Sequence, residues 1–97
     1  MDIKYSNHRI ERACTDFTYA VVKYGDKNAS RLVQRIKEIK AASSIEFMIE
    51  HRIGRCHPLK GDRKNQYGLD LVHPARLVIE KTQNGYVVLV IEIVDYH

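Results

Sequence analysis

The sequence predicts a single α+β domain in which N-terminal helices pack on a small, twisted antiparallel β-sheet. Apolar residues in the first half recur every three or four positions, as on one face of a helix. In the second half they alternate with polar residues, as in half-buried strands. Helices followed by a run of hairpin-connected strands are typical of α+β architecture. A chain of 97 residues is sufficient for one domain, which we expect to span residues 1–97.

Two amphipathic helices are expected after a short first strand at residues 3–5. The first is capped by Ser6 or Asn7 and ends at Gly25. The second begins between residues 26 and 30. Their apolar stripes are Ile10, Ala13, Cys14, Phe17, Val21 and Tyr24 in the first helix, and Ala29, Leu32, Val33, Ile36 and Ile39 in the second.

A third, shorter helix and three strands are expected in the remainder. Ser43 and Glu46 have the spacing of a capping box, which predicts a helix over residues 47–51. Residues 66–71 and 76–80 alternate as strands, separated by a break at His73-Pro74. Residues 86–96 form a near-continuous apolar run, typical of a central strand.

The length of the turn at Gln83-Asn84-Gly85 decides how the last two strands pair. A two-residue turn would place Arg76 opposite Ile93, whereas a three-residue loop would place it opposite Glu92. We favour the three-residue loop, because it gathers polar side chains on one face of the sheet. A β-bulge would change which end groups meet. The gathered side chains are Arg76, Glu80, Glu92 and Tyr96.

Composition indicates a cytoplasmic globular protein. No apolar run reaches the ~18 to 20 residues that a membrane span needs, and residues 1–12 are too polar for a secretory signal. The formal net charge is +4. Residues 51–64 hold five Lys or Arg and two His against one acid, a distribution that suits a polyanionic partner or a solvated loop. Cys14 and Cys56 have no metal-ligand spacing and are expected to be free thiols.

Two histidines are the candidates for acid–base chemistry. His57 lies in the basic stretch and His97 closes the segment Asp95-Tyr96-His97. With nearby Lys and Arg, such residues suffice to cut RNA without a metal or cofactor, because the ribose 2′-hydroxyl is an internal nucleophile. Spacing alone leaves two other interpretations open: Asp95 could pair with a lysine, and Arg76 could pair with Glu92. A metal site formed by His57, Asp95 and His97 is also conceivable, but these residues fit no recurring metal-ligand spacing.

A resemblance to a known family sharpens this interpretation. The run His57-Pro58-Leu59-Lys60-Gly61-Asp62-Arg63, the strand beginning Arg76-Leu77-Val78-Ile79 and the segment Asp95-Tyr96-His97 resemble the HigB branch of the RelE/ParE toxins. The resemblance covers the chain from His57 onward. It implies a ribosome-dependent messenger-RNA endonuclease that a cognate antitoxin silences, a helix-turn-helix protein of the HigA kind. It also implies a fold of two N-terminal helices against a small twisted antiparallel sheet, without cofactor or metal.

The same resemblance implies roles for individual residues. His57, Asp95, Tyr96 and His97 would form the active site, with the two histidines sharing acid and base work in an order that the sequence leaves open. Lys60, Arg63 and Arg76 would contact RNA or phosphate. The chain departs from the family pattern at Asn65-Gln66 and at His73-Pro74.

Two other functions share this fold. A ParE-like relative would poison DNA gyrase and would need no proton-transfer groups, so the segment Asp95-Tyr96-His97 argues against it. A catalytically inactive binding module would act by repression or sequestration. Whether cellular messages fragment, DNA breaks or neither occurs after induction distinguishes the three.

Overall fold

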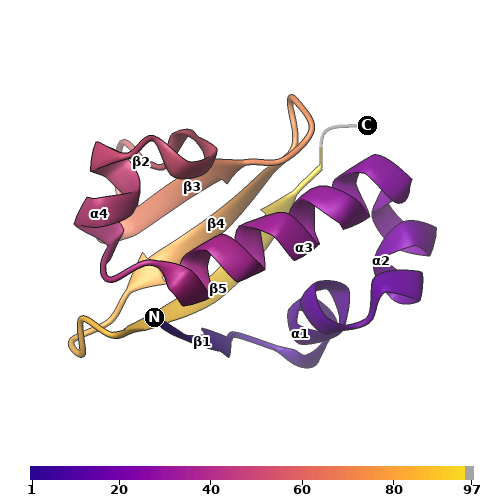
Figure 1. Cartoon of the computed structure of the whole chain (residues 1–97), viewed down its shortest axis with the longest axis horizontal. Helices are drawn as coiled ribbons and strands as arrows, with labels where there is room; N and C mark the ends of the chain where they lie inside the picture. Colours follow the sequence, from indigo (N-terminus) through magenta and orange to yellow (C-terminus); the bar gives the residue numbers. More distant parts are fainter. Residues whose placement is uncertain (96–97) are drawn as a thin grey trace.

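The computed structural model of the protein describes residues 1–95 and shows helices stacked on one face of a sheet (Figure 1). The elements, in chain order, are β1 (Asp2–Tyr5), α1 (His8–Thr15), α2 (Phe17–Tyr24), α3 (Asp26–Ala41), α4 (Ile45–Glu50), a 3-10 turn η1 (Ile53–Arg55), β2 (His57–Pro58), β3 (Gln66–Asp70), β4 (Arg76–Lys81) and β5 (Val87–Val94). No helix in this part of the chain is long and apolar enough to cross a membrane.

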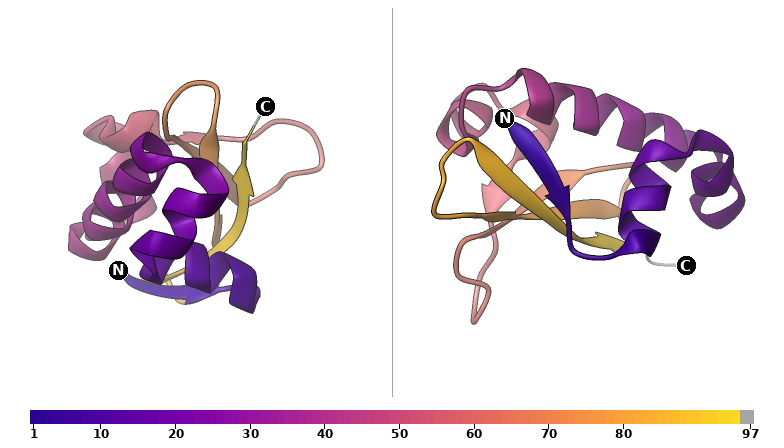
Figure 2. Two further views of the ribbon diagram at one scale, coloured as in Figure 1. Left: turned by 90° about the vertical axis from the view of Figure 1, so that its right-hand side faces the viewer. Right: turned by 90° about the horizontal axis from the view of Figure 1, so that it is seen from below.

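The sheet has the strand order β1-β5-β4-β3-β2. Strands β3, β4 and β5 form the expected antiparallel meander, and the short strand β2, which was not predicted, pairs antiparallel with β3. Strand β1 pairs with β5 in parallel, so the sheet is mixed. In Figure 2 the helices lie on one side of the sheet, with α3 running along it. The predicted α+β class, with N-terminal helices on a small sheet, is confirmed.

The core lies between α3 and the sheet. Leu32 and Ile39 on the inner face of α3 are almost fully buried, as are Leu69, Leu77 and Val90 on the facing strands. Each such side chain contributes roughly 1.5–3 kcal/mol when it leaves water. The alternation that predicted the strands therefore describes one buried face, and leaves the other face for function.

The first expected helix is divided in two. Asp16 adopts an extended backbone, with φ −117° and ψ 100°, and its carboxylate accepts a hydrogen bond from the N–H of Tyr19 at 3.1 Å. An aspartate that caps the following turn competes with helix continuation, which explains why α1 ends at Thr15 and α2 begins at Phe17. The apolar stripe crosses this break because both helices face the same core.

The cap of the short helix α4 also differs from the expectation. Ser44, not Ser43, is the N-cap, and its hydroxyl accepts from the N–H of Phe47 at 3.0 Å. The carboxylate of Glu46 lies 2.6 Å from Lys81 Nζ, at the end of β4, which lowers the pKa of Glu46. Glu46 thus joins α4 to the sheet.

Neither predicted register holds along the whole β4–β5 hairpin. The connecting loop covers residues 82–86, and Lys81 pairs with Val88. This end has the register expected for a two-residue turn. A bulge between Val78 and Ile79 then shifts the pairing by one residue, so that Arg76 lies opposite Val94. The favoured pairing of Arg76 with Glu92 is wrong, because the turn end has the other register, and the bulge on β5 then inserts one further residue.

The bulge nevertheless moves Glu92 onto the face that carries Arg76. One row of paired residues crosses the sheet from His57 through Gly68 and Val78 to Glu92. We call the face of the sheet that carries this row the open face, because α3 covers the opposite one. The loop of residues 59–65 projects on this side, away from the helices (Figure 2).

Candidate functional site

Two adjoining hollows share His57 and Arg76. The first has a volume of about 300 Å³ and is lined by His57, Pro58, Leu59, Lys60 and Arg76. The second has a volume of about 350 Å³ and is lined by Arg55, His57, Asp70, His73, Pro74 and Arg76. Three residues predicted from sequence, His57, Lys60 and Arg76, therefore meet at one place.

The ring of His57 is oriented by a hydrogen bond to the backbone two residues earlier in the chain. Its Nδ1 lies 2.8 Å from the carbonyl oxygen of Arg55. A carbonyl oxygen only accepts, so this hydrogen bond requires the proton of the neutral ring on Nδ1 and leaves Nε2 as a proton acceptor. His57 is exposed, so a substrate can reach that nitrogen.

A glycine on the neighbouring strand makes room for this ring. Gly68 is the pairing partner of His57. A Cβ added at Gly68 would lie 3.3 Å from His57 Cε1 and 3.3 Å from a methyl carbon of Leu59. Any larger residue would push the imidazole and the wall of the first hollow outward.

Arg76 stands at the start of β4, opposite Asp70 on β3. The Asp70 carboxylate lies 3.4 Å from Arg55 Nε across the second hollow. The lining of both hollows together carries three fixed cations, Arg55, Lys60 and Arg76, against one carboxylate. An excess of cationic donors around a histidine favours a phosphate group as ligand.

The loop of residues 59–65 contributes Lys60 and Arg63 in different ways. Lys60 is exposed and lines the first hollow. Arg63 instead turns along the open face, where its guanidinium donates to Gln66 at 2.7 Å and to Glu92 at 2.6 Å. Arg63 is thus a loop anchor in this structure, and the structure does not bring it into either hollow.

The predicted C-terminal group is only partly described. Asp95 is half-buried just beyond β5, and its charge helps to raise the pKa of Tyr24 on α2, an effect to which burial of Tyr24 contributes most. Asp95 does not line either hollow. Tyr96 and His97 lie outside the described residues.

Sequence reasoning missed the three other charged or titratable residues that line the second hollow. Arg55 was counted only as part of a basic stretch, His73 as a turn residue, and Asp70 as an exposed strand position. The strand alternation that predicts β3 places Asp70 on the open face, and its place at the end of β3 was the one available signal. The shared hollow depends on β2 and η1 lying beside β3, an arrangement that was not predicted from the sequence.

Both thiols are poorly suited to nucleophilic chemistry. Burial raises the pKa of Cys14 to about 12 and that of Cys56 to about 11. A thiol reacts as its thiolate, so at neutral pH both remain protonated. Within residues 1–95 no group of three or more His, Cys, Asp or Glu side chains is arranged to hold a metal ion.

Comparison with known proteins gives a fold and no sequence family. No protein-family model matches the chain, and no curated protein matches its sequence. Among solved structures it is similar to the "YoeB/ParE toxin from Agrobacterium tumefaciens", with a TM-score of 0.54, 17% sequence identity and coverage of 100% of both chains. The chain therefore shares an α+β fold with that protein, with α1 to α4 stacked on one face of a mixed five-stranded sheet, which confirms the predicted fold class.

Proposed function

We propose that this chain is the toxin of a toxin–antitoxin pair and cleaves messenger RNA on the ribosome in the manner of HigB. The observation that carries the proposal is the first hollow, where His57, Lys60 and Arg76 meet although they come from a short edge strand, a loop and a central strand. Proton transfer and phosphate binding are the two tasks of metal-free RNA cleavage, and the residue types for both are present.

The reaction is an internal displacement at phosphorus. The ribose 2′-oxygen attacks the scissile phosphorus, its proton passes to a general base, and the bond from phosphorus to the 5′-oxygen breaks. A general acid gives that oxygen a proton, so the products are a 2′,3′-cyclic phosphate and a 5′-hydroxyl. The hydrogen bond from His57 Nδ1 to Arg55 leaves Nε2 to carry one of these protons.

Arg76 and Lys60 would stabilise the phosphate as negative charge builds on it. Arg76 borders both hollows, so its guanidinium can grip a phosphate that lies between them in a two-pronged way. From the resemblance, His97 supplies the second proton-transfer group, Asp95 assists it, and Tyr96 stacks on a nucleotide. Arg63 would contact RNA only after leaving Glu92.

Two macromolecular partners follow from this function. Both hollows are partly open to solvent, so the ribosome would supply the positioning of the message. A cognate antitoxin, of the helix-turn-helix kind, would silence the toxin. A fold shared with a protein titled YoeB/ParE toxin supports the toxin role.

Mapping message ends after induction tests the proposal. We expect primer extension to show new ends within a translated message and few in a matched copy without a start codon. His57→Ala should abolish these ends. His8→Ala should not, because His8 is an exposed residue of α1 that lines neither hollow. Equal cutting of both copies would contradict ribosome dependence, and broken DNA with intact messages would favour gyrase poisoning.

A further inference from the structure

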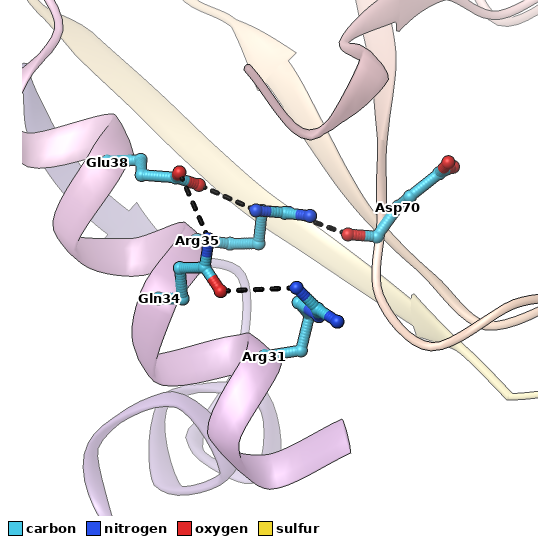
Figure 3. A network of polar contacts seen from close by, with 5 residues as sticks. All are labelled: Arg31, Gln34, Arg35, Glu38 and Asp70. Carbon is cyan, nitrogen blue, oxygen red and sulfur yellow. Dashed lines mark hydrogen bonds and ion pairs between the residues drawn. The ribbon is translucent and has the colours of Figure 1, made fainter. Parts of the chain in front are cut away.

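A buried arginine on α3 contacts the backbone of Asp70, one of the residues that line the second hollow. Arg35 is 7% exposed, and the rest of the described core is apolar. Its Nε donates to the backbone oxygen of Asp70 at 2.7 Å, and its Nη1 donates to Glu38 at 2.8 Å (Figure 3). The Glu38 carboxylate balances the charge that burial would otherwise make costly.

The same guanidinium also supports the turn η1. Gly54 has φ 57° and lies against Arg35, because a Cβ added there would come within 2.6 Å of Arg35 Nε. The flanking Arg55 has φ 52°, a left-handed conformation that residues with a Cβ rarely adopt. Packing must hold this turn in place, and Arg35 is the side chain beneath it.

Both supported segments lead directly into the site. Gly54 precedes Arg55, whose carbonyl oxygen receives the hydrogen bond from His57 Nδ1. Asp70 pairs across the sheet with Arg76 and, through its carboxylate, with Arg55. In Figure 3 the Asp70 carbonyl faces Arg35 while its carboxylate points away from it. One guanidinium thus touches the two segments that deliver His57 and Arg76.

We propose that Arg35 is a positioning residue of the site, which fixes the proton of neutral His57 on Nδ1 by holding η1 against the end of β3. This inference depends on the proposed RNA cleavage only where it predicts a change in the cleavage rate. The geometry of the histidine ring itself is a property of the free protein. Arg35 lies behind the second hollow and contacts no substrate.

A lysine cannot replace this arginine. A lysine ammonium can reach Asp70 or Glu38, but it lacks the flat guanidinium that packs under Gly54 while it donates to both residues. Arg35→Lys should therefore loosen η1 while it keeps the buried charge. Gly54→Ala perturbs the same contact from the other side, since the new methyl group would collide with Arg35. The matched control is Arg31→Lys, one turn earlier on α3, because Arg31 contacts Gln34 on its own helix (Figure 3).

Histidine side-chain NMR of the free protein tests the proposal. Long-range proton–nitrogen spectra at pH 8 should show His57 of the native protein protonated on Nδ1. In Arg35→Lys and Gly54→Ala we expect His57 to move toward the Nε2-protonated form, while the His8 and His51 signals stay in place and Arg31→Lys changes nothing. An unchanged His57 signal in either folded variant would overturn the proposal, as would failure of both variants to fold, which would make Arg35 a residue of the fold alone.

Cleavage of ribosome-bound message separates this inference from the proposed function. At saturating substrate both variants should lose tenfold or more in rate, with an altered pH profile and little change in KM. Should the native protein cut no message while its His57 signal responds as expected, the proposed function fails and the positioning role stands. A full rate in a variant whose His57 tautomer has shifted would contradict the consequence drawn for catalysis.

Discussion

At the scale of single residues, the account depends on side chains whose chemistry is specific. Arg76 borders both hollows, and only a planar guanidinium grips phosphate with two parallel donors. Arg76→Lys keeps the charge and the strand, so its effect isolates that geometry. We expect a loss of about tenfold or more in cleavage rate, or roughly 1.4 kcal/mol of transition-state stabilisation.

The measurement for Arg76 is single-turnover cleavage of programmed ribosomes, with thermal melting alongside. The control is Lys81→Arg. Lys81 is the last residue of β4, pairs with Val88 beside the hairpin loop, and lines neither hollow. A folded Arg76→Lys protein that cuts at the native rate would remove Arg76 from the phosphate site.

His97 carries the second residue-scale prediction. It follows Asp95 closely in sequence, and the resemblance to HigB toxins falls on this segment. His97→Gln removes a proton-transfer group and little apolar area, so stability should stay the same. Cleavage should fall by the ~10² to 10⁴ typical of losing a general acid or base. We would compare it with His8→Gln on α1; similar rates for the two variants would return both proton transfers to His57 and Asp95.

At the scale of elements, an ion pair between Arg63 and Glu92 ties the loop of residues 59–65 to the open face, in addition to backbone hydrogen bonds of Leu59 with Gln66 and of Asn65 with Lys81. Arg63 and Glu92 lie 2.6 Å apart, but their side chains are 40% and 46% exposed, so solvent screens the pair and its contribution to stability is about 0–1 kcal/mol. Its effect is therefore on where the loop lies and not on whether the domain folds.

Glu92→Gln tests this anchor. We expect nearly unchanged melting, faster amide exchange within residues 59–65, and a few-fold rise in KM because Lys60 is no longer held at the first hollow. Glu80→Gln on the same face is the control, since Glu80 contacts Gln66 and not the arginine. Faster cleavage at unchanged KM would show instead that Glu92 withholds Arg63 from RNA.

Element types were predictable from sequence, while the pairing details were not. Periodicity identifies α3 and the strands β3 and β4, because each presents one buried face, while a near-continuous apolar run identifies β5. The division of the first helix at Asp16 depends on whether its carboxylate caps the next turn. The bulge in β5 depends on packing in three dimensions, and it decides that Glu92 shares a face with Arg76.

The candidate site was predictable to a similar extent. A local motif supplied His57 and Lys60, and the strand pattern supplied Arg76. Arg55 and His73 were not expected beside them, because that depends on where η1 and the β3–β4 connection lie relative to the end of β3. The support from Arg35 could not be read from the sequence, where a basic residue on a helix suggests a solvated face, whereas Arg35 is buried.

At the scale of the whole molecule, the hydrophobic core and the candidate site lie in different parts of the fold. Core residues come from α1 to α4 and from one face of the sheet, which these helices cover in Figure 1. The hollows are lined instead by residues of η1, β2, the loop after β2, the end of β3, the β3–β4 connection and the start of β4. A substrate of the proposed site would approach from the side opposite α3. Such an exposed site can work on RNA that another body holds in place, which agrees with cleavage on the ribosome.

The most direct test of the central claim is cleavage of a ribosome-bound message that carries a single 2′-deoxynucleotide at the mapped cut. If the 2′-hydroxyl is the nucleophile, the native message should yield a 2′,3′-cyclic phosphate end, and the deoxy message should remain intact at that position. The same deoxy substitution one nucleotide downstream should leave cutting unchanged. Cleavage that persists at the deoxy position would mean that water attacks, and would contradict the mechanism proposed for His57 and Arg76.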